Sequence, residues 1–327
     1  IKALTSIQSR QDINAERFVK DADIIAAYLA GGQACIQVFF FRGGRNYGNK
    51  AYFPRHDKQA DLDEILSAFI GQFYQTRPAA KDVLVSHKIA EAEILSEALS
   101  VDSPYRVILS TPQRGGRKRL IDAAVDNAKT AHARHLADTR KQTELLGKLA
   151  EIFDLDETPE RVEVYDNSHI SGTNAVGAMI VAGADGFEKK HYRLFNIKDK
   201  IEPGDDYAMM REVFKRRFSR AQKEGNAHSW PDLVLIDGGK GQLSSATQIM
   251  TELGLEHIPL VGISKGPDRN AGREQFHMNG RDSFTLPMKD PALYFIQRLR
   301  DEAHRFAIGT HRNLSLIHIS EPTRQDT

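Results

Sequence analysis

The sequence predicts an α/β fold made of two tandem domains, each with a three-strand meander followed by parallel strands and flanking helices. Short apolar runs bounded by Gly, Pro or polar residues alternate with longer segments of helical periodicity. The same order of three strands, helix, strand, helix and strand occurs twice, on either side of the polar segment DLDETPE at residues 154–160. We therefore interpret the chain as a duplication of one fold.

In the first copy, glycine-containing turns separate the three expected strands. Gly31 and Gly32 follow the first strand, and RGGR at residues 42–45 follows the second. Apolar residues then recur every three or four positions after Asp61, which suits a helix N-cap. The expected elements are strands 23–29, 34–41 and 49–54, helix 61–74, strand 82–85, helix 91–99, strand 105–109 and a long helix from about residue 120 to 153.

The second copy centres on PDLVLIDGGKG at residues 231–241, where an unbroken apolar run ends at Asp237 and two glycines. Such a run is typical of a strand buried on both faces. In the first strand of this copy, Val162, Val164 and Asp166 share one face. The expected elements are strands 161–167, 175–182 and 190–197, helix 204–224, strand 231–237, helix 242–253, strand 258–264, a hairpin over 274–286 with its turn at Asn279–Gly280, and helix 290–308.

This order of elements is that of a ribonuclease H-like fold, in which the first strand of the meander also pairs in parallel with the fourth strand. We expect domains at residues 21–153 and 154–312. Residues 1–20 are expected to be the end of a helical segment. The tail at 313–327 fits nothing expected, and we interpret it as a sequence or assembly artefact.

Composition limits the classes of protein to consider. The net charge of +1 excludes a chain that is basic throughout, so any surface for nucleic acid must be local. A single cysteine, Cys35, excludes an internal disulfide and fits a reducing compartment. No signal peptide opens the chain and no apolar run approaches membrane-spanning length, so we expect a soluble intracellular protein. The absence of an initial Met suggests a fragment.

The predicted pairing brings two carboxylates together. If strands one and four of the second copy are parallel neighbours, Asp166 and Asp237 both lie at carboxyl ends of strands, where open α/β sheets place ligands. Two close carboxylates repel unless a cation lies between them, and oxygen ligands suit Mg²⁺ or Mn²⁺. His304, beside the apolar stripe of the last helix, can reach the same edge as a metal ligand or a proton carrier. These three residues predict a metal site for phosphodiester chemistry.

Each of these residues also has a structural interpretation. An Asp before Gly-Gly is often a turn residue, Asp166 could cap a loop, and a lone helical His is usually satisfied structurally. The GGKG turn lacks the spacing and the Ser or Thr of a phosphate loop, so an NTPase is discounted. The convergence of three suitable residues under one topology favours the metal site.

Four motifs in the second copy also carry a resemblance: VEVYDNSHISGTNAVGAMIV, GDDYAMMREVFKRRF, PDLVLIDGGKGQL and LRDEAHRFAI. They resemble the C-terminal half of the UvrC family, a component of the bacterial excinuclease ABC, over residues 1 to about 311. The resemblance implies a ribonuclease H-like endonuclease that makes the 5′ incision beside damaged DNA in nucleotide excision repair. It also implies an Asp-Asp-His triad with a divalent metal. The family's triad falls on Asp166, Asp237 and His304.

The resemblance further implies partners and a location. The partners are damaged double-stranded DNA and the excinuclease component UvrB, and no membrane is involved. We expect a bacterial cytoplasmic protein that is associated with the nucleoid when it acts. Residues 1–11 look like the tail of the family's UvrB-binding segment. The family's N-terminal GIY-YIG nuclease domain and C-terminal helix-hairpin-helix module have no counterpart in this sequence.

The first copy is predicted to be inactive. Its central strand DVLVSH places His87 where Asp237 stands in the second copy, and its first strand ADIIAAYL offers no acid at the position of Asp166. We interpret this copy as a scaffold or a surface for DNA or protein. Metal bound near His87 would contradict this interpretation.

Candidate DNA contacts come from basic residues near glycine-rich turns and on one helix. A helix N-terminus with basic neighbours suits phosphate, although a solvated charged turn explains the first cluster equally well. Glu212 could be an additional acid near the metal or the i,i+4 partner of Arg216. The candidate contacts are Lys240, Arg114, Arg117, Lys118, Arg119, Arg211, Lys215 and Arg216. The alternative to a nuclease is a catalytically silent DNA- or protein-binding module of the same repair complex.

Overall fold

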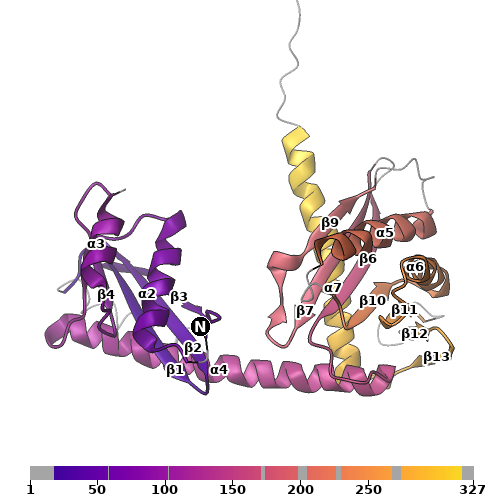
Figure 1. Cartoon of the computed structure of the whole chain (residues 1–327), viewed down its shortest axis with the longest axis horizontal. Helices are drawn as coiled ribbons and strands as arrows, with labels where there is room; N and C mark the ends of the chain where they lie inside the picture. The colour runs from indigo at the N-terminus through magenta and orange to yellow at the C-terminus, as the bar shows by residue number, and fades with distance from the viewer. Residues whose placement is uncertain are drawn as a thin grey trace, which may run out of the picture. The chain divides into compact units, whose positions relative to one another are not determined.

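The structure is a computed structural model that describes residues 18–57, 59–101, 103–170, 174–197, 205–225, 230–266 and 274–318. The chain divides into two compact units, Ile1–Ala137 and Asp138–Thr327 (Figure 1). The expected helix at residues 1–11 lies outside the described residues, as do residues 319–327 of the expected tail.

The first unit contains the predicted meander. Its sheet has the strand order β3-β2-β1-β4-β5. β1 pairs antiparallel with β2 and parallel with β4, which is the pairing that the ribonuclease H-like prediction requires. The strands are β1 (Ala22–Ala30), β2 (Gln33–Arg42), β3 (Arg45–Tyr52), β4 (Asp82–Val85) and β5 (Ile108–Ser110).

Helices cover both faces of this sheet. α2 (Leu62–Phe73), followed by the short 3-10 helix η1 (Tyr74–Thr76), and α3 (Ala92–Val101) pack on one face, where Ile25, Ile36 and Val83 meet Leu66 and Ile70. The start of α4 (Gly115–Phe153) packs on the other face through Ile121 and Ala124. The alternating strand pattern therefore forms two cores, one on each side of the sheet.

The prediction for the start of α4 was wrong by about one and a half turns. The helix begins at Gly115 rather than near Leu120, so the basic cluster after Gly115 belongs to its first turns and not to a flexible turn. Tertiary packing explains the difference: a Cβ on Gly116 would lie 2.0 Å from the ring of Phe18. The glycine lets the helix start against this ring.

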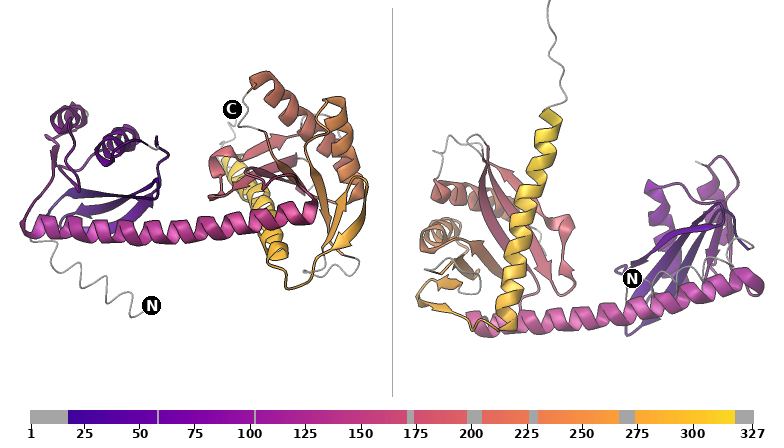
Figure 2. Two further views of the ribbon diagram at one scale, coloured as in Figure 1. Left: turned by 60° about the horizontal axis from the view of Figure 1, so that its bottom comes forward. Right: turned by 180° about the vertical axis from the view of Figure 1, so that it is seen from behind.

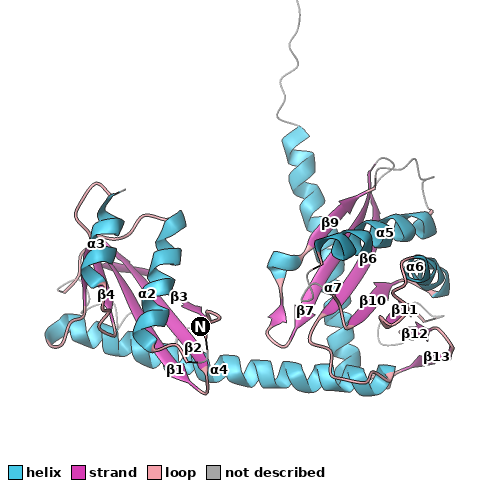
Figure 3. Cartoon of the chain, in the orientation of Figure 1, coloured by secondary structure: helices cyan, strands magenta, loops and turns pink. Residues whose placement is uncertain are grey.

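The second unit has a sheet of the order β13-β12-β11-β10-β6-β7-β8, with β9 also paired to β7 (Figure 3). β6 pairs antiparallel with β7 and parallel with β10, so the predicted topology is confirmed in this copy as well. The predicted hairpin is also present and turns at Gly280, whose φ is +73°. The strands are β6 (Val162–Ile170), β7 (Asn174–Gly183), β8 (Gly186–Phe187), β9 (Arg193–Asn196), β10 (Leu233–Asp237), β11 (Leu260–Ser264), β12 (Gln275–Met278) and β13 (Arg281–Thr285).

Different helices cover the two faces of this sheet (Figure 2). α7 (Pro291–His318) and the last turns of α4 pack on one face against Val162, Val164 and Leu235. α5 (Asp206–Glu224) and α6 (Lys240–Glu252) pack on the other, around Tyr165 and Ile236. The residues of α4 in this unit's core are Leu146, Leu149 and Phe153, whereas the predicted domain boundary falls after residue 153.

Two predicted elements of the second unit differ in extent. The third strand was expected from Lys190, but residues Lys189–His191 form the 3-10 helix η2 and β9 begins at Arg193. The last helix was expected to end near residue 308, and α7 continues to His318. No helix among the described residues is both long enough and apolar enough to cross a membrane.

Candidate active site at the carboxyl ends of β6 and β10

The register of β6 and β10 places the two predicted aspartates side by side. Val164 pairs with Leu235 and Tyr165 with Ile236, so the next residues along the two parallel strands are Asp166 and Asp237. Because side chains alternate along a strand, both carboxylates continue the face of Val164 and Leu235, which α7 covers. The structure thus brings the two acids together under one helix.

Asp166 is paired with the predicted histidine. His304 Nδ1 lies 2.9 Å from Asp166 Oδ2, and because an ionised carboxylate can only accept, Nδ1–H donates this hydrogen bond. The Asp166 side chain is 8% exposed, while that of His304 is 59% exposed. This contact fixes the ring and directs its second nitrogen, Nε2, away from the carboxylate.

Asp237 is paired with an arginine that sequence reasoning missed. Arg300 donates to Asp237 Oδ1 twice, from Nε at 2.9 Å and from Nη2 at 2.5 Å. The same guanidinium lies near a second buried acid, with Nη1 3.7 Å from Glu274 Oε1. The signal for Arg300 was its spacing, because it precedes His304 by four residues and therefore lies on the same face of α7.

The pKa of the Asp237 carboxyl is affected by the neighbouring charge of Asp166. Burial raises the pKa of the Asp237 carboxyl above its usual value, the charge of Arg300 lowers it, and the charge of Asp166 raises it again. His304 also acts on this carboxyl, lowering its pKa. Asp166 and His304 therefore both lie close enough to Asp237 to act on its charge.

These side chains are not gathered as a preformed metal cage. Within the described ranges, no three His, Cys, Asp or Glu side chains are grouped closely enough to hold a metal ion. Instead, His304 contacts Asp166, and Arg300 contacts Asp237.

Comparison with known proteins identifies the family. Residues 150–308 match the UvrC RNAse H endonuclease domain, and residues 21–135 match the UvrC ribonuclease H-like domain. The chain belongs to the UvrC family. It is 54% identical over 317 residues to UvrABC system protein C of Maricaulis maris, covering 95% of this chain and 50% of that protein. Identity to the Rhodospirillum rubrum protein of the same name is 55% over 316 residues, covering 95% and 49%.

The chain therefore spans about half the length of the curated UvrC relatives it matches. Among solved structures, it is similar to Endonuclease V of Ciona intestinalis in complex with inosine-containing DNA. That similarity has 15% identity and a TM-score of 0.27, and it covers 38% of this chain and 58% of the other. A TM-score this low supports no conclusion about the present chain.

In this UvrC chain, the turn after Asp237 is locked against the neighbouring strand. Gly238 N donates to Ile263 O at 2.9 Å, and a Cβ on Gly238 would lie 1.4 Å from the Gln242 side chain. Lys240 follows as the exposed first residue of α6. Burial lowers the pKa of the nearby His277 ring, and the positive charge of Lys240 lowers it further.

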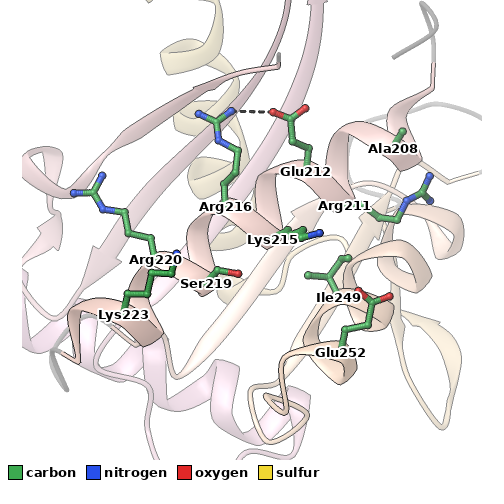
Figure 4. A pocket seen from close by; sticks show the side chains of 10 residues that line it. All are labelled: Ala208, Arg211, Glu212, Lys215, Arg216, Ser219, Arg220, Lys223, Ile249 and Glu252. Atoms are coloured by element: carbon green, nitrogen blue, oxygen red, sulfur yellow. Dashed lines mark hydrogen bonds and ion pairs between the residues drawn. The ribbon is translucent and has the colours of Figure 1, made fainter. Parts of the chain in front are cut away.

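The basic residues of α5 lie on the layer opposite to α7. They line an open groove between α5 and α6 (Figure 4). Arg216 donates to Glu212 at 3.0 Å and to the Asn196 carbonyl at 2.7 Å, which is the i,i+4 pairing considered for Glu212. The groove is lined by Ala208, Arg211, Glu212, Lys215, Arg216, Ser219, Arg220, Lys223, Ile249 and Glu252. Sequence reasoning missed Arg220 and Lys223.

The basic cluster of the first unit makes contacts within the chain. Arg117 forms an ion pair with Asp82 at 3.0 Å, and Lys118 pairs with Asp122. Arg119 lies over the Phe18 ring, and Arg114 is exposed just before α4. Arg117, Lys118 and Arg119 thus have partners within the chain, on the first turns of α4.

The first unit has no acid at the position of Asp166. Continuing the parallel register of β1 and β4, in which Ile25 pairs with Val85, places Ala27 opposite His87. The Ala27 amide donates to Ser86 Oγ at 2.9 Å, and Ser86 Oγ lies 2.8 Å from His87 Nδ1. The counterpart of the carboxylate pair is thus an alanine and a histidine.

Proposed function

We propose that this chain is a divalent-metal-dependent DNA endonuclease that makes the 5′ incision beside damaged DNA in the excinuclease ABC system. One observation carries the proposal: Asp166 and Asp237 lie side by side at carboxyl ends of parallel strands, and His304 contacts the first of them. Damaged double-stranded DNA and the excinuclease component UvrB are the proposed partners. The bacterial cytoplasm is the proposed location, with association with the nucleoid during repair.

The donor set fits a hard divalent cation. Asp166 raises the pKa of Asp237, which is the effect of two carboxylates facing each other. A divalent cation bound by both would remove this repulsion, and carboxylate oxygens are the ligands preferred by Mg²⁺ and Mn²⁺. Asp166 and Asp237 would hold the metal, and His304 would complete the site as ligand or proton carrier. The bound metal would supply Lewis-acid polarisation of the phosphodiester.

The protein's own groups would orient the reaction and move the proton. Asp166 fixes the ring of His304 through Nδ1, so Nε2 can take or give a proton at the exposed side of the site. Lys240 at the start of α6 would bind a phosphate beside Asp237. The other proposed DNA contacts are Arg114, Arg117, Lys118, Arg119, Arg211, Lys215 and Arg216.

The proposal is tested by metal binding and by DNA cleavage. Mn²⁺ binding by calorimetry is expected to be lost in Asp166→Asn and in Asp237→Asn, and nicking of plasmid DNA in Mn²⁺ is expected to be lost with it. Asp282→Asn, an exposed carboxylate on β13, is the matched control and should bind as wild type does. Binding unchanged in both aspartate variants would show that they do not form the site, and would favour a silent DNA- or protein-binding module.

A further inference from the structure

We propose that Arg300 is the resident counter-charge of the carboxylate pair and that it competes with a divalent cation for Asp237. This inference rests on the proposed metal site. It goes further in assigning to Arg300, a residue outside the predicted triad, control over how tightly that site binds its metal.

Two hydrogen bonds to Asp237 hold the guanidinium group of Arg300 in place. Nε and Nη2 both donate to one oxygen, Asp237 Oδ1, at 2.9 and 2.5 Å. The Arg300 side chain is 10% exposed and that of Asp237 is 23% exposed, so water screens the pair weakly. A charge-assisted contact of this kind is among the strongest hydrogen bonds available to a carboxylate.

Charge balance explains why the pair is needed. Two adjacent carboxylates repel each other, and burying an unpaired carboxylate is costly. Asp166 has His304 as its partner, and Asp237 has Arg300, one turn earlier on α7. Each acid therefore has its own hydrogen-bond partner on α7, and Arg300 supplies the permanent positive charge beside the pair.

The same charge opposes the metal. A guanidinium does not lose its proton in proteins, so Arg300 stays positive and repels a second cation at Asp237. A metal that bound Asp237 through Oδ1 would have to displace the guanidinium, and a metal bound through Oδ2 would still face its positive charge.

Glu274 offers the guanidinium a second partner. Its Oε1 lies 3.7 Å from Arg300 Nη1 and accepts a hydrogen bond from Gln297 Nε2 at 2.8 Å, and the residue is 6% exposed. A small shift of the guanidinium toward Glu274 would release Asp237 without leaving a buried charge unpaired. The guanidinium thus lies between two acids, Asp237 and Glu274, and could move from one to the other when a metal binds.

If Arg300 only positions Asp237, replacing Arg300 should change the metal affinity in the opposite direction. If Arg300 only orients Asp237 so that Oδ2 faces the metal, its removal would weaken metal binding. If it competes, its removal strengthens binding. The sign of the change in metal affinity therefore separates the two roles.

The test is Mn²⁺ binding to the full chain, measured by the electron paramagnetic resonance signal of free Mn²⁺ and by calorimetry. A positive charge within about 4–6 Å lowers the proton affinity of a carboxylate by about tenfold or more, and a metal ion that binds the same carboxylate experiences the same repulsion. Arg300→Gln is thus expected to lower the Kd for Mn²⁺ by about tenfold. Arg300→Lys, which keeps the charge, should remain close to wild type. Arg298→Gln, two residues away and bonded to Gln142, is the matched control.

Two further measurements examine the exchange. Without metal, the Tm of Arg300→Gln should fall because Asp237 and Asp166 lose a counter-charge, and Mn²⁺ should raise this Tm by more than it raises that of wild type. Glu274→Gln removes the second partner of the guanidinium, so it should raise the Kd for Mn²⁺.

Equal or weaker Mn²⁺ binding by folded Arg300→Gln would overturn the inference and leave the proposed nuclease intact. Absence of Mn²⁺ binding in both wild type and Arg300→Gln would overturn the inference together with the metal site. Tighter Mn²⁺ binding by Arg300→Gln, together with wild-type affinity in Arg300→Lys, would support the inference.

Discussion

Arg300 and His304 lie one turn apart on α7, and each contacts a different one of the two adjacent carboxylates. Arg300 donates to Asp237, and His304 to Asp166. The intervening Ala303 is fully buried against the sheet, as is Leu299 before them. The packing of one helix therefore sets the position of both bases, and the site depends on the register of α7 against β6 and β10.

His304→Gln is expected to reduce DNA nicking by about 10²- to 10⁴-fold, the usual contribution of a general acid or base. Stability should change little, because the amide of Gln can still donate a hydrogen bond to Asp166 and the side chain at this position is 59% exposed. The measurement is the rate of plasmid nicking in Mn²⁺ together with the Tm. His257→Gln, an exposed histidine of the same unit, should behave as wild type. A His304→Gln variant that nicks at the wild-type rate would exclude this residue from the reaction.

Strand patterns made the carboxylate pair predictable. An unbroken apolar strand ending at Asp237 and an alternating strand ending at Asp166 fix the face and the edge on which the acids lie. The place of His304 beside an apolar helical stripe predicted that it reaches this edge, and the structure shows that it contacts Asp166 there. These three residues needed only periodicity and a topology.

The contact of Arg300 with Asp237 and the groove between α5 and α6 were harder to predict from the sequence, because both depend on tertiary packing. Four arginines occur among residues 298–312, and only the rotation of α7 against the sheet shows which of them meets Asp237. The basic face of α5 was visible, but its position on the layer opposite to α7 follows from how Met210, Val213 and Phe214 pack. The early start of α4 at Gly115 likewise depends on Phe18, about a hundred residues away.

Glu163 is a buried acid whose loss should destabilise the second unit. It is fully buried and accepts hydrogen bonds from Arg161 at 2.8 Å, Arg217 at 2.7 Å and the Tyr165 hydroxyl at 2.6 Å. Glu163→Ala would leave the largely buried charges of Arg161 and Arg217 without this acidic partner. The substitution should lower the free energy of unfolding by about 3–5 kcal/mol, measured by urea denaturation. The exposed Glu256→Ala should cost little. A loss below about 1 kcal/mol, the level of a surface ion pair, would show that the network contributes little to stability.

His87 should make the stability of the first unit sensitive to acid. Burial and then the charge of Lys118 lower the pKa of His87 below 6.5, with Asp63 acting in the opposite direction. Between the folded pKa and 6.5, the unfolded chain binds more protons, so the free energy of unfolding falls as the pH drops through this window. NMR titration of the His87 ring should give a midpoint below 6.5 that rises in Lys118→Ala. A midpoint at or above 6.5 would contradict the expectation, and Mn²⁺ broadening of this ring would contradict an inactive first copy.

Cys35 should report the unfolding of the first unit. Its side chain is fully buried on β2, and burial raises the pKa of the thiol to about 11. At pH 8 only about 0.1% of such a thiol is ionised, and thiol reagents attack the ionised form. Labelling with a maleimide should therefore be negligible in the native chain and complete in urea. Rapid labelling under native conditions, with the circular dichroism spectrum unchanged, would mean that β2 is accessible.

The α5–α6 groove should contribute to DNA affinity through charge alone. Lys215 and Lys223 are exposed in it, and among the described residues neither has an acidic partner. Replacing both with Ala should reduce the slope of log K against log salt by about one for each lysine, equally for all DNA sequences. The measurement is fluorescence anisotropy of a labelled duplex without metal, which separates binding from cleavage. Lys148→Ala with Lys190→Ala, two lysines outside the groove, is the matched control. An unchanged slope in the groove variant would mean that these lysines are surface charge and that the DNA follows another face of the unit.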